Sequence, residues 1–254
     1  MDIKTELYKK LCSILTINYN LIDEKENKKI NKVVSVLHKD YLISASKEAR
    51  AIINKKDIAN KYNLMITIYN RKIKEHQALS LLIQLFEIAM RTQVAIILSN
   101  KFSTPNSDDW YWLTADGKHQ KLIDRVSNRA RTISKIITPN MTTFDMFHML
   151  TMNDVKVLYE SHWEGDCKEL FNNTSYKGNT IIPLTTKEMF LSRFKRINKY
   201  RNELYHGNPG TSSWRHIIND IENILVHLGY NIEEAINNID PNHSIISLRY
   251  KYNN

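Results

Sequence analysis

Three side chains that could do chemistry together lie close to one another in the stretch RNELYHGNP, namely Arg201, Asn202 and His206. Histidine exchanges protons near neutral pH, whereas arginine keeps its positive charge and binds carboxylates or phosphates with two parallel hydrogen bonds. An asparagine beside them can orient either group. The set suits a reaction that moves a proton while negative charge develops on the substrate.

The preceding run TTKEMFLSRFKRINKY predicts the helix that must position this set, beginning near Thr185 and stopped by Gly207 and Pro209. Its apolar stripe consists of Phe190, Phe194, Ile197 and Leu204. Arg201 falls within that stripe, where an unpaired guanidinium is costly.

A second long helix, predicted over about residues 62–100, offers a partner for this arginine. Glu87 lies inside its apolar arc, and Arg91 lies one turn later at the edge. A buried carboxylate and a buried guanidinium on two helices are natural partners. A Glu87–Arg201 ion pair in the core would explain Arg201 but would leave Asn202 and His206 unexplained, so a structural and a functional interpretation both stay open.

Helical periodicity dominates the remaining chain and predicts an all-α fold. We expect helices over residues 2–17 and 29–41, a basic helix from Lys118 to Ile137, helices starting at Thr142 or Thr143 and at Asn153, and a helix in SSWRHIINDIENILVHLGY ending at Gly229. Two segments, STPNSDDWYW and NNTSYKGNTIIP, are predicted loops, and SIISLRYKYNN is a short strand or a disordered tail. Lys121, Arg125 and Arg129 form a basic stripe that either follows phosphates or is a solvated face.

The composition narrows the class of protein. A formal net charge of +9 with a sequence pI near 9.3 favours a polyanionic partner, although a genome-wide bias towards lysine would give the same charge. Only 6 Gly and 5 Pro argue for long helices. Two distant cysteines form no disulfide framework or metal spacing, so we expect a cytoplasmic protein without a metal site. The chain contains no run of eighteen apolar residues, and we therefore expect no membrane span.

RNELYH resembles the Arg-x(4–6)-His signature of the HEPN superfamily, with Asn202 as the polar residue after the arginine. Within this superfamily the chain resembles the Abi-like (abortive infection) branch over about residues 42–230. The resemblance lies in the order of four segments along the chain, namely FEIAMR with its Glu-x-x-x-Arg pattern, KFSTPNSDDWYW, MTTFDMFHMLTMNDVKVLYESHW and RNELYH. The chain departs from that family at Glu203, where a basic residue is common, and at Gly207 and Asn208, which follow the histidine.

This resemblance implies a HEPN-like helical bundle with extra N-terminal helices. The implied organisation is an N-terminal helical extension over residues 1–42 packed on the main domain, an Abi-like domain over 43–240 and a tail over 241–254. It also implies a homodimer in which both copies contribute to a composite active site.

The activity that the resemblance implies is a metal-independent endoribonuclease without a cofactor, acting in phage defence or as a toxin. The 2′-hydroxyl of RNA would attack the phosphate, with Arg201, Asn202 and His206 as catalytic residues and Glu87 and Arg91 holding Arg201. A structured RNA or an acidic protein could act as the antitoxin.

Two alternatives remain. A non-catalytic RNA-binding HEPN module or regulator would keep the basic stripe without needing His206. A helical DNA-binding regulator would need a helix-turn-helix, and the sequence contains no convincing one.

Overall fold

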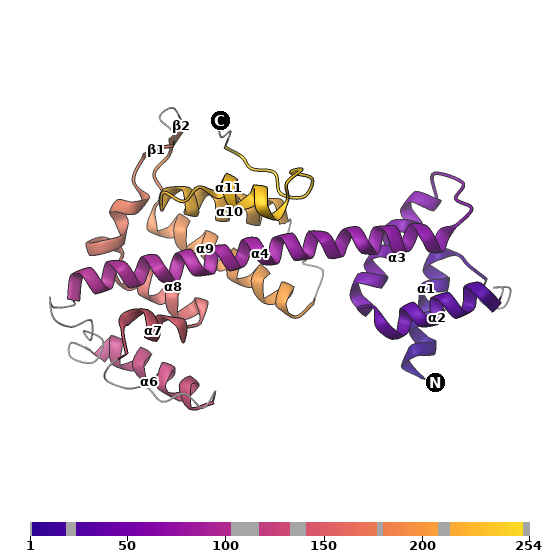
Figure 1. Ribbon diagram of the computed structural model, residues 1–254, viewed down its shortest axis with the longest axis horizontal. Coiled ribbons are helices and arrows are strands. Elements are labelled where there is room, and N and C mark those ends of the chain that lie inside the picture. The colour runs from indigo at the N-terminus through magenta and orange to yellow at the C-terminus, as the bar shows by residue number, and fades with distance from the viewer. Residues whose placement is uncertain are drawn as a thin grey trace. The chain divides into compact units, whose positions relative to one another are not determined.

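Helices account for nearly all regular structure in the computed structural model, which confirms the all-α prediction (Figure 1). The structure describes residues 2–18, 24–102, 117–132, 141–176, 180–207 and 214–250. The helices of the N-terminal half are α1 (Ile3–Leu15), α2 (Glu24–Val36), α3 (Lys39–Ile53), α4 (Lys61–Phe102) and α6 (Gly117–Thr132). Those that follow are α7 (Thr143–His148), α8 (Met152–Ser161), the π-helix η2 (Trp163–Cys167), the 3₁₀-helix η3 (Lys168–Phe171), α9 (Lys187–Tyr205), α10 (Trp214–His227) and α11 (Ile232–Ile239).

The chain packs as two units. The first contains Met1–Ser80 and Tyr200–Ser213, and the second contains Leu81–Lys199 and Trp214–Asn254. Helices α4 and α9 each contribute residues to both. The predicted boundary at residue 42 falls inside α3, because α1 packs against both α2 and α3 and shares a core with the first part of α4.

The core of the first unit is built from apolar residues at helical spacing on α1, α3 and α4. Its members include Leu7, Leu11, Leu15, Leu42, Ala45, Met65 and Ile68. Small side chains on α3, Ala45 and Ala49, are fully buried and allow a neighbouring helix to approach closely. The predicted helix over 29–41 is instead divided, since α2 ends at Val36 and α3 begins at Lys39.

An aromatic cluster forms the centre of the second unit. The ring of Phe190 lies 4.9 Å from Phe171 and 5.2 Å from Trp163, measured between centroids, and Phe194 contacts Phe86 at 5.5 Å. Aromatic pairs at such distances stabilise a core beyond the area they bury. The predicted apolar stripe of α9 is thereby confirmed, because Phe190, Phe194, Ile197 and Leu204 are all buried.

Two expectations near the ends of α9 and α10 were wrong. The segment NNTSYKGNTIIP contains the strands β1 (Thr174–Tyr176) and β2 (Thr180–Ile182), paired antiparallel with Ser175 opposite Ile181. Helix α11 follows Gly229 and was not expected, although Asn231 caps it by accepting from the amide of Glu234. The described part of the C-terminal tail contains no strand. The predicted loop at 103–112 and residues 133–137 of the basic helix lie outside the described residues.

The helices α7 and α8 both begin with a capping box. Thr142 pairs with Asp145 and Thr151 pairs with Asp154, each threonine accepting from the aspartate amide while the carboxylate accepts from the threonine amide. Asp154 differs from Asp145 in being buried, and it also accepts from Arg129 at 2.5 Å and lies 3.0 Å from Arg125. Asp154 therefore fixes the start of α8 to α6.

Among the described helices, α4 is long and apolar enough to cross a membrane by length and composition alone. This is weak evidence, because the core helix of a soluble protein passes the same test and 44% of the apolar stretch is buried inside the protein.

Substitution of Asp154 by Asn should lower the free energy of unfolding by about 1–3 kcal/mol at pH 7, because two guanidinium groups lose a charged acceptor. Burial acts to raise the pKa of Asp154, but hydrogen bonds from Thr151 and Arg129 outweigh it and leave the pKa below its usual value. The stabilisation is thus complete above the unfolded pKa, about 3.9, and is lost as the pH falls through the lower folded pKa. Urea unfolding of wild type and variant between pH 3 and 7 measures this difference.

The matched control is Asp145→Asn, which alters the same capping box at an exposed position. Its effect should be smaller. An equal loss of stability in both variants would show that the capping box, and not the contact with α6, is what matters at Asp154.

Candidate active site

Arg201 is half-buried on the last turns of α9, and the side chains of Asn202 and Tyr205 contact its guanidinium. Nη1 donates to the side-chain oxygen of Asn202 at 3.1 Å, and the guanidinium carbon lies 4.4 Å from the ring centroid of Tyr205. A guanidinium over an aromatic face is attracted by the ring, and Tyr205 occupies the position one turn later where such a pair can form. These two contacts help to orient Arg201.

His206 is exposed and follows directly after α9. Its amide still donates to the carbonyl of Asn202 at 3.2 Å, so the backbone of His206 continues the helical path for one more residue. Asn202 thus stands one turn before His206 on the same side of the helix and is hydrogen-bonded to Arg201. The three residues predicted from sequence therefore lie on one helix end, with Asn202 between the other two.

Gly207 terminates the helix in the left-handed conformation, with φ of 68°. Its amide donates to the carbonyl of Leu204 at 2.9 Å, as expected for a glycine that stops a helix. The expected helix stop is confirmed. Asn208 and Pro209 lie outside the described residues.

A second histidine, His38, lies against this helix end within the first unit. A Cβ placed on Gly207 would be 2.7 Å from Nε2 of His38. His38 caps α3, since its Nδ1 accepts from the amide of Asp40 at 3.3 Å, and its own amide donates to the hydroxyl of Tyr69. Nothing in the sequence places residue 38 beside residue 207, because the contact depends on how distant segments pack.

Beside His38 lies a small group of tyrosine and histidine side chains. The ring of Tyr41 meets that of His38 edge-on at 5.5 Å, and its hydroxyl is 2.6 Å from Nδ1 of His76. Burial, followed by the nearby Tyr69 and Glu75, raises the pKa of Tyr41 to about 12. Burial, with a smaller effect of His38, lowers the pKa of His76. The phenol of Tyr41 is therefore uncharged at physiological pH.

Glu87 and Arg91 belong to the second unit and pair with each other. Glu87 is buried as expected, and its Oε2 accepts from Nη1 of Arg91 at 3.2 Å. Arg91 also donates to the carbonyl of Leu150 at 3.3 Å and so connects α4 to the segment between α7 and α8. The expected support of Arg201 by these two residues stays a prediction.

Two of the three residues of the basic stripe on α6 make contacts within the protein. Arg125 and Arg129 contact the carboxylate of Asp154, and Arg129 also donates to the carbonyl of Met149 at 2.9 Å. Lys121 is exposed. A structural role therefore accounts for the two arginines, and contact with phosphates stays a prediction for the stripe.

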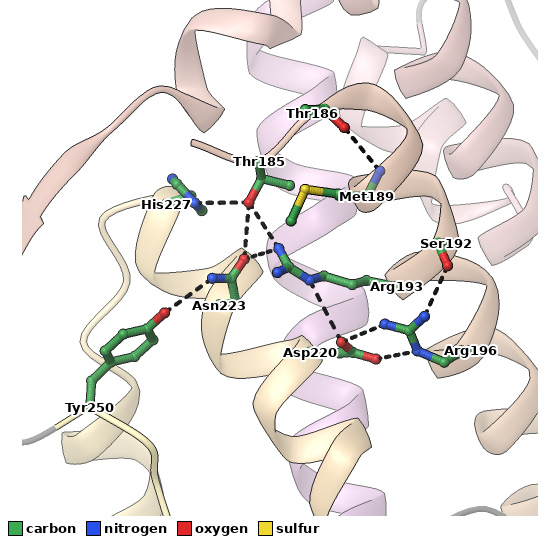
Figure 2. Close-up of polar contacts among 10 residues, drawn as sticks. All are labelled: Thr185, Thr186, Met189, Ser192, Arg193, Arg196, Asp220, Asn223, His227 and Tyr250. Carbon is green, nitrogen blue, oxygen red and sulfur yellow. Dashed lines mark hydrogen bonds and ion pairs between the residues drawn. The ribbon is translucent and has the colours of Figure 1, made fainter. Parts of the chain in front are cut away.

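A polar network that the sequence did not reveal joins α9 to α10 (Figure 2). Nε and Nη2 of Arg196 donate to the two carboxylate oxygens of Asp220, each at 2.8 Å, in the bidentate geometry that is strongest for such pairs. Arg193 donates to Asn223 and, at 2.8 Å, to the hydroxyl of Thr185.

The network continues to the C-terminal segment. Asn223 donates to the hydroxyl of Tyr250 at 3.2 Å (Figure 2). Glu222, which is fully buried, accepts from the amides of Arg249 and Tyr250 at 2.7 and 3.0 Å. His227 is also buried at 3.2 Å from Thr185, and burial followed by the charge of Arg193 lowers its pKa. These groups face one another inside the second unit, so we assign them to holding α9, α10 and the tail together.

The end of α9 could support acid–base chemistry. Among the described residues, no three His, Cys, Asp or Glu side chains are grouped so that they could hold a metal ion. Arg201 offers an oriented positive charge, and His206 offers an exposed imidazole. Together they match a substrate with an anionic centre and a hydroxyl to activate.

Comparison with known proteins adds no family to this description. No protein-family model, no curated protein and no solved structure matches the chain.

Proposed function

We propose that the protein is a metal-independent endoribonuclease of the HEPN type, with Arg201, Asn202 and His206 as its catalytic residues. The observation that carries the proposal is the helix end itself. An exposed histidine follows an asparagine that is hydrogen-bonded to an oriented arginine. The net charge of +9 supports a polyanionic substrate.

The chemistry uses the nucleophile that RNA carries. His206 accepts the proton of the 2′-hydroxyl as its oxygen attacks the adjacent phosphorus. Arg201 stabilises the negative charge that develops on the non-bridging phosphate oxygens, and Asn202 keeps its guanidinium in place. The bond to the 5′-oxygen breaks, and that oxygen takes up a proton. The products are a 2′,3′-cyclic phosphate and a 5′-hydroxyl.

Substitution of His206 by Ala should reduce cleavage of RNA by at least about 10²-fold, because a positioned acid–base group contributes that much or more. Purified wild type and variant are incubated with total RNA in EDTA, and the new ends are mapped. Cyclic phosphates from the wild type alone are the expected result.

His216→Ala is the matched control, since His216 is an exposed histidine on α10 in the second unit. It should cut as the wild type does. If neither wild type nor variants cut RNA while all bind it equally, the protein is a non-catalytic RNA-binding module. Cleavage that requires added Mg²⁺ would also overturn the proposed mechanism.

A homodimer with a composite active site is part of the proposal, and one surface of the second unit supports it. Along α4 the exposed positions from Leu81 to Ile96 are uncharged, and Leu81, Ile88 and Ile96 are 46%, 61% and 38% exposed. Apolar side chains spaced by whole helical turns form the kind of stripe that a second helix covers. A second copy of the chain would bring the same stripe to this face.

Substitution of Ile88 by Lys should convert the dimer to a monomer, because a charge would be buried at the centre of the stripe. Light scattering after gel filtration measures the mass. Val36→Lys is the control, as Val36 is 75% exposed on α2, outside this surface. A wild type that is monomeric at all concentrations would contradict the dimer, and a wild type released from membranes only by detergent would assign the stripe to lipid.

We further propose a cytoplasmic role in phage defence or as a toxin held in check by a structured RNA or an acidic protein. Basic charge supports either partner. Expression of the wild type should arrest growth, whereas His206→Ala should not. That variant is then purified from cells, and the ratio of absorbance at 260 and 280 nm is measured before and after nuclease digestion. An RNA partner is lost on digestion, whereas a protein partner remains.

A further inference from the structure

His38 presents one ring nitrogen to the end of α9. Its Nδ1 is occupied as the cap of α3, where it accepts from the amide of Asp40. A neutral imidazole that accepts at one nitrogen carries its proton on the other. Nε2 of His38 is therefore an N–H donor.

Nε2 is the ring atom of His38 that lies nearest to Gly207, the residue directly after His206. A Cβ at position 207 would lie 2.7 Å from Nε2 of His38, which no side chain could accommodate without displacing the ring. Glycine thus allows the imidazole to approach the helix end. Within the part of the chain that the structure describes, Nε2 has no hydrogen-bond partner, and the His38 side chain is exposed.

The groups around His38 do not use this donor either. Tyr41 meets the ring edge-on, its hydroxyl lies against Nδ1 of His76, and the hydroxyl of Tyr69 accepts from the His38 amide. A donor that these neighbouring groups do not use, next to the proposed phosphate site, is suited to an anionic oxygen of the substrate.

We propose that His38 is a further substrate-contacting residue, whose Nε2–H donates to a phosphate oxygen of RNA bound at His206. The inference rests on the proposed function and deepens it, because a residue of the N-terminal helices completes the site at the end of α9. In this role His38 donates a hydrogen bond and transfers no proton. It holds the phosphate while Arg201 stabilises its charge.

Two variants separate this role from the helix cap. His38→Asn keeps an oxygen that caps α3, as asparagine is among the best capping residues, but it is too short to place a donor at Nε2. His38→Gln keeps an amide N–H near Nε2 and weakens the cap. We expect His38→Asn to melt like the wild type but to cut RNA about 10²-fold more slowly. We expect His38→Gln to melt roughly 2–4 °C lower while retaining more activity than His38→Asn.

Binding is measured separately with a 2′-O-methyl oligoribonucleotide, which has no free nucleophile. Its Kd should rise roughly tenfold in His38→Asn, as expected for one hydrogen bond to a charged group, and less in His38→Gln. If His38→Asn cuts and binds as the wild type does, His38 is only a helix cap and the inference is overturned, while the ribonuclease proposal stands. If the wild type does not cut at all, the ribonuclease proposal fails, and unequal binding by the two variants still supports the phosphate contact. Equal binding would then overturn both.

Discussion

Helix α9 carries three arginines beside an apolar face, and much of the structure depends on how their charges are accommodated. An unpaired guanidinium taken from water costs several kcal/mol, so each needs a partner. Arg193 and Arg196 find theirs on α10, in Asn223 and Asp220 (Figure 2). Arg201 is treated differently, with an amide and an aromatic ring as the two contacts that orient it.

Arg193 and Arg196 thus have structural roles, whereas a catalytic role is proposed for Arg201. A carboxylate that binds a guanidinium in two parallel hydrogen bonds, as Asp220 binds Arg196, occupies the donors that a phosphate would need. The guanidinium of Arg201 contacts the side-chain amide of Asn202 and the ring face of Tyr205. The same helix therefore uses Arg193 and Arg196 to attach α10, and presents Arg201 at an end where an exposed histidine follows.

Sequence periodicity predicted the helices that bury one continuous stripe of apolar side chains. The long helix at 62–100, the helix before RNELYH and the helix ending at Gly229 are all present. Helix starts were expected at Thr142 or Thr143 and at Asn153, and the structure has the capping residues at Thr142 and Thr151, each three residues before an aspartate. The hairpin at Thr174–Ile182 was missed since its strands are three residues each, too short to show alternation, and its polar residues are typical of loops. The break between α2 and α3 was not predicted, because the residue that caps α3 is His38 and histidine is not a usual capping residue.

Contacts between residues that are distant in the chain limited how much of the candidate site could be predicted from the sequence. The grouping of Arg201, Asn202 and His206 could be predicted from the sequence, because all three lie at one helix end. The position of His38 beside Gly207 could not be predicted, because it depends on α1, α3 and α4 packing into one core. Gly207 serves two purposes at once. Its left-handed backbone stops α9, and its missing Cβ leaves space for the imidazole. A glycine that looks like an ordinary helix stop thus also determines which side chains can meet at the end of the helix, and the N-terminal helices become part of the site's construction.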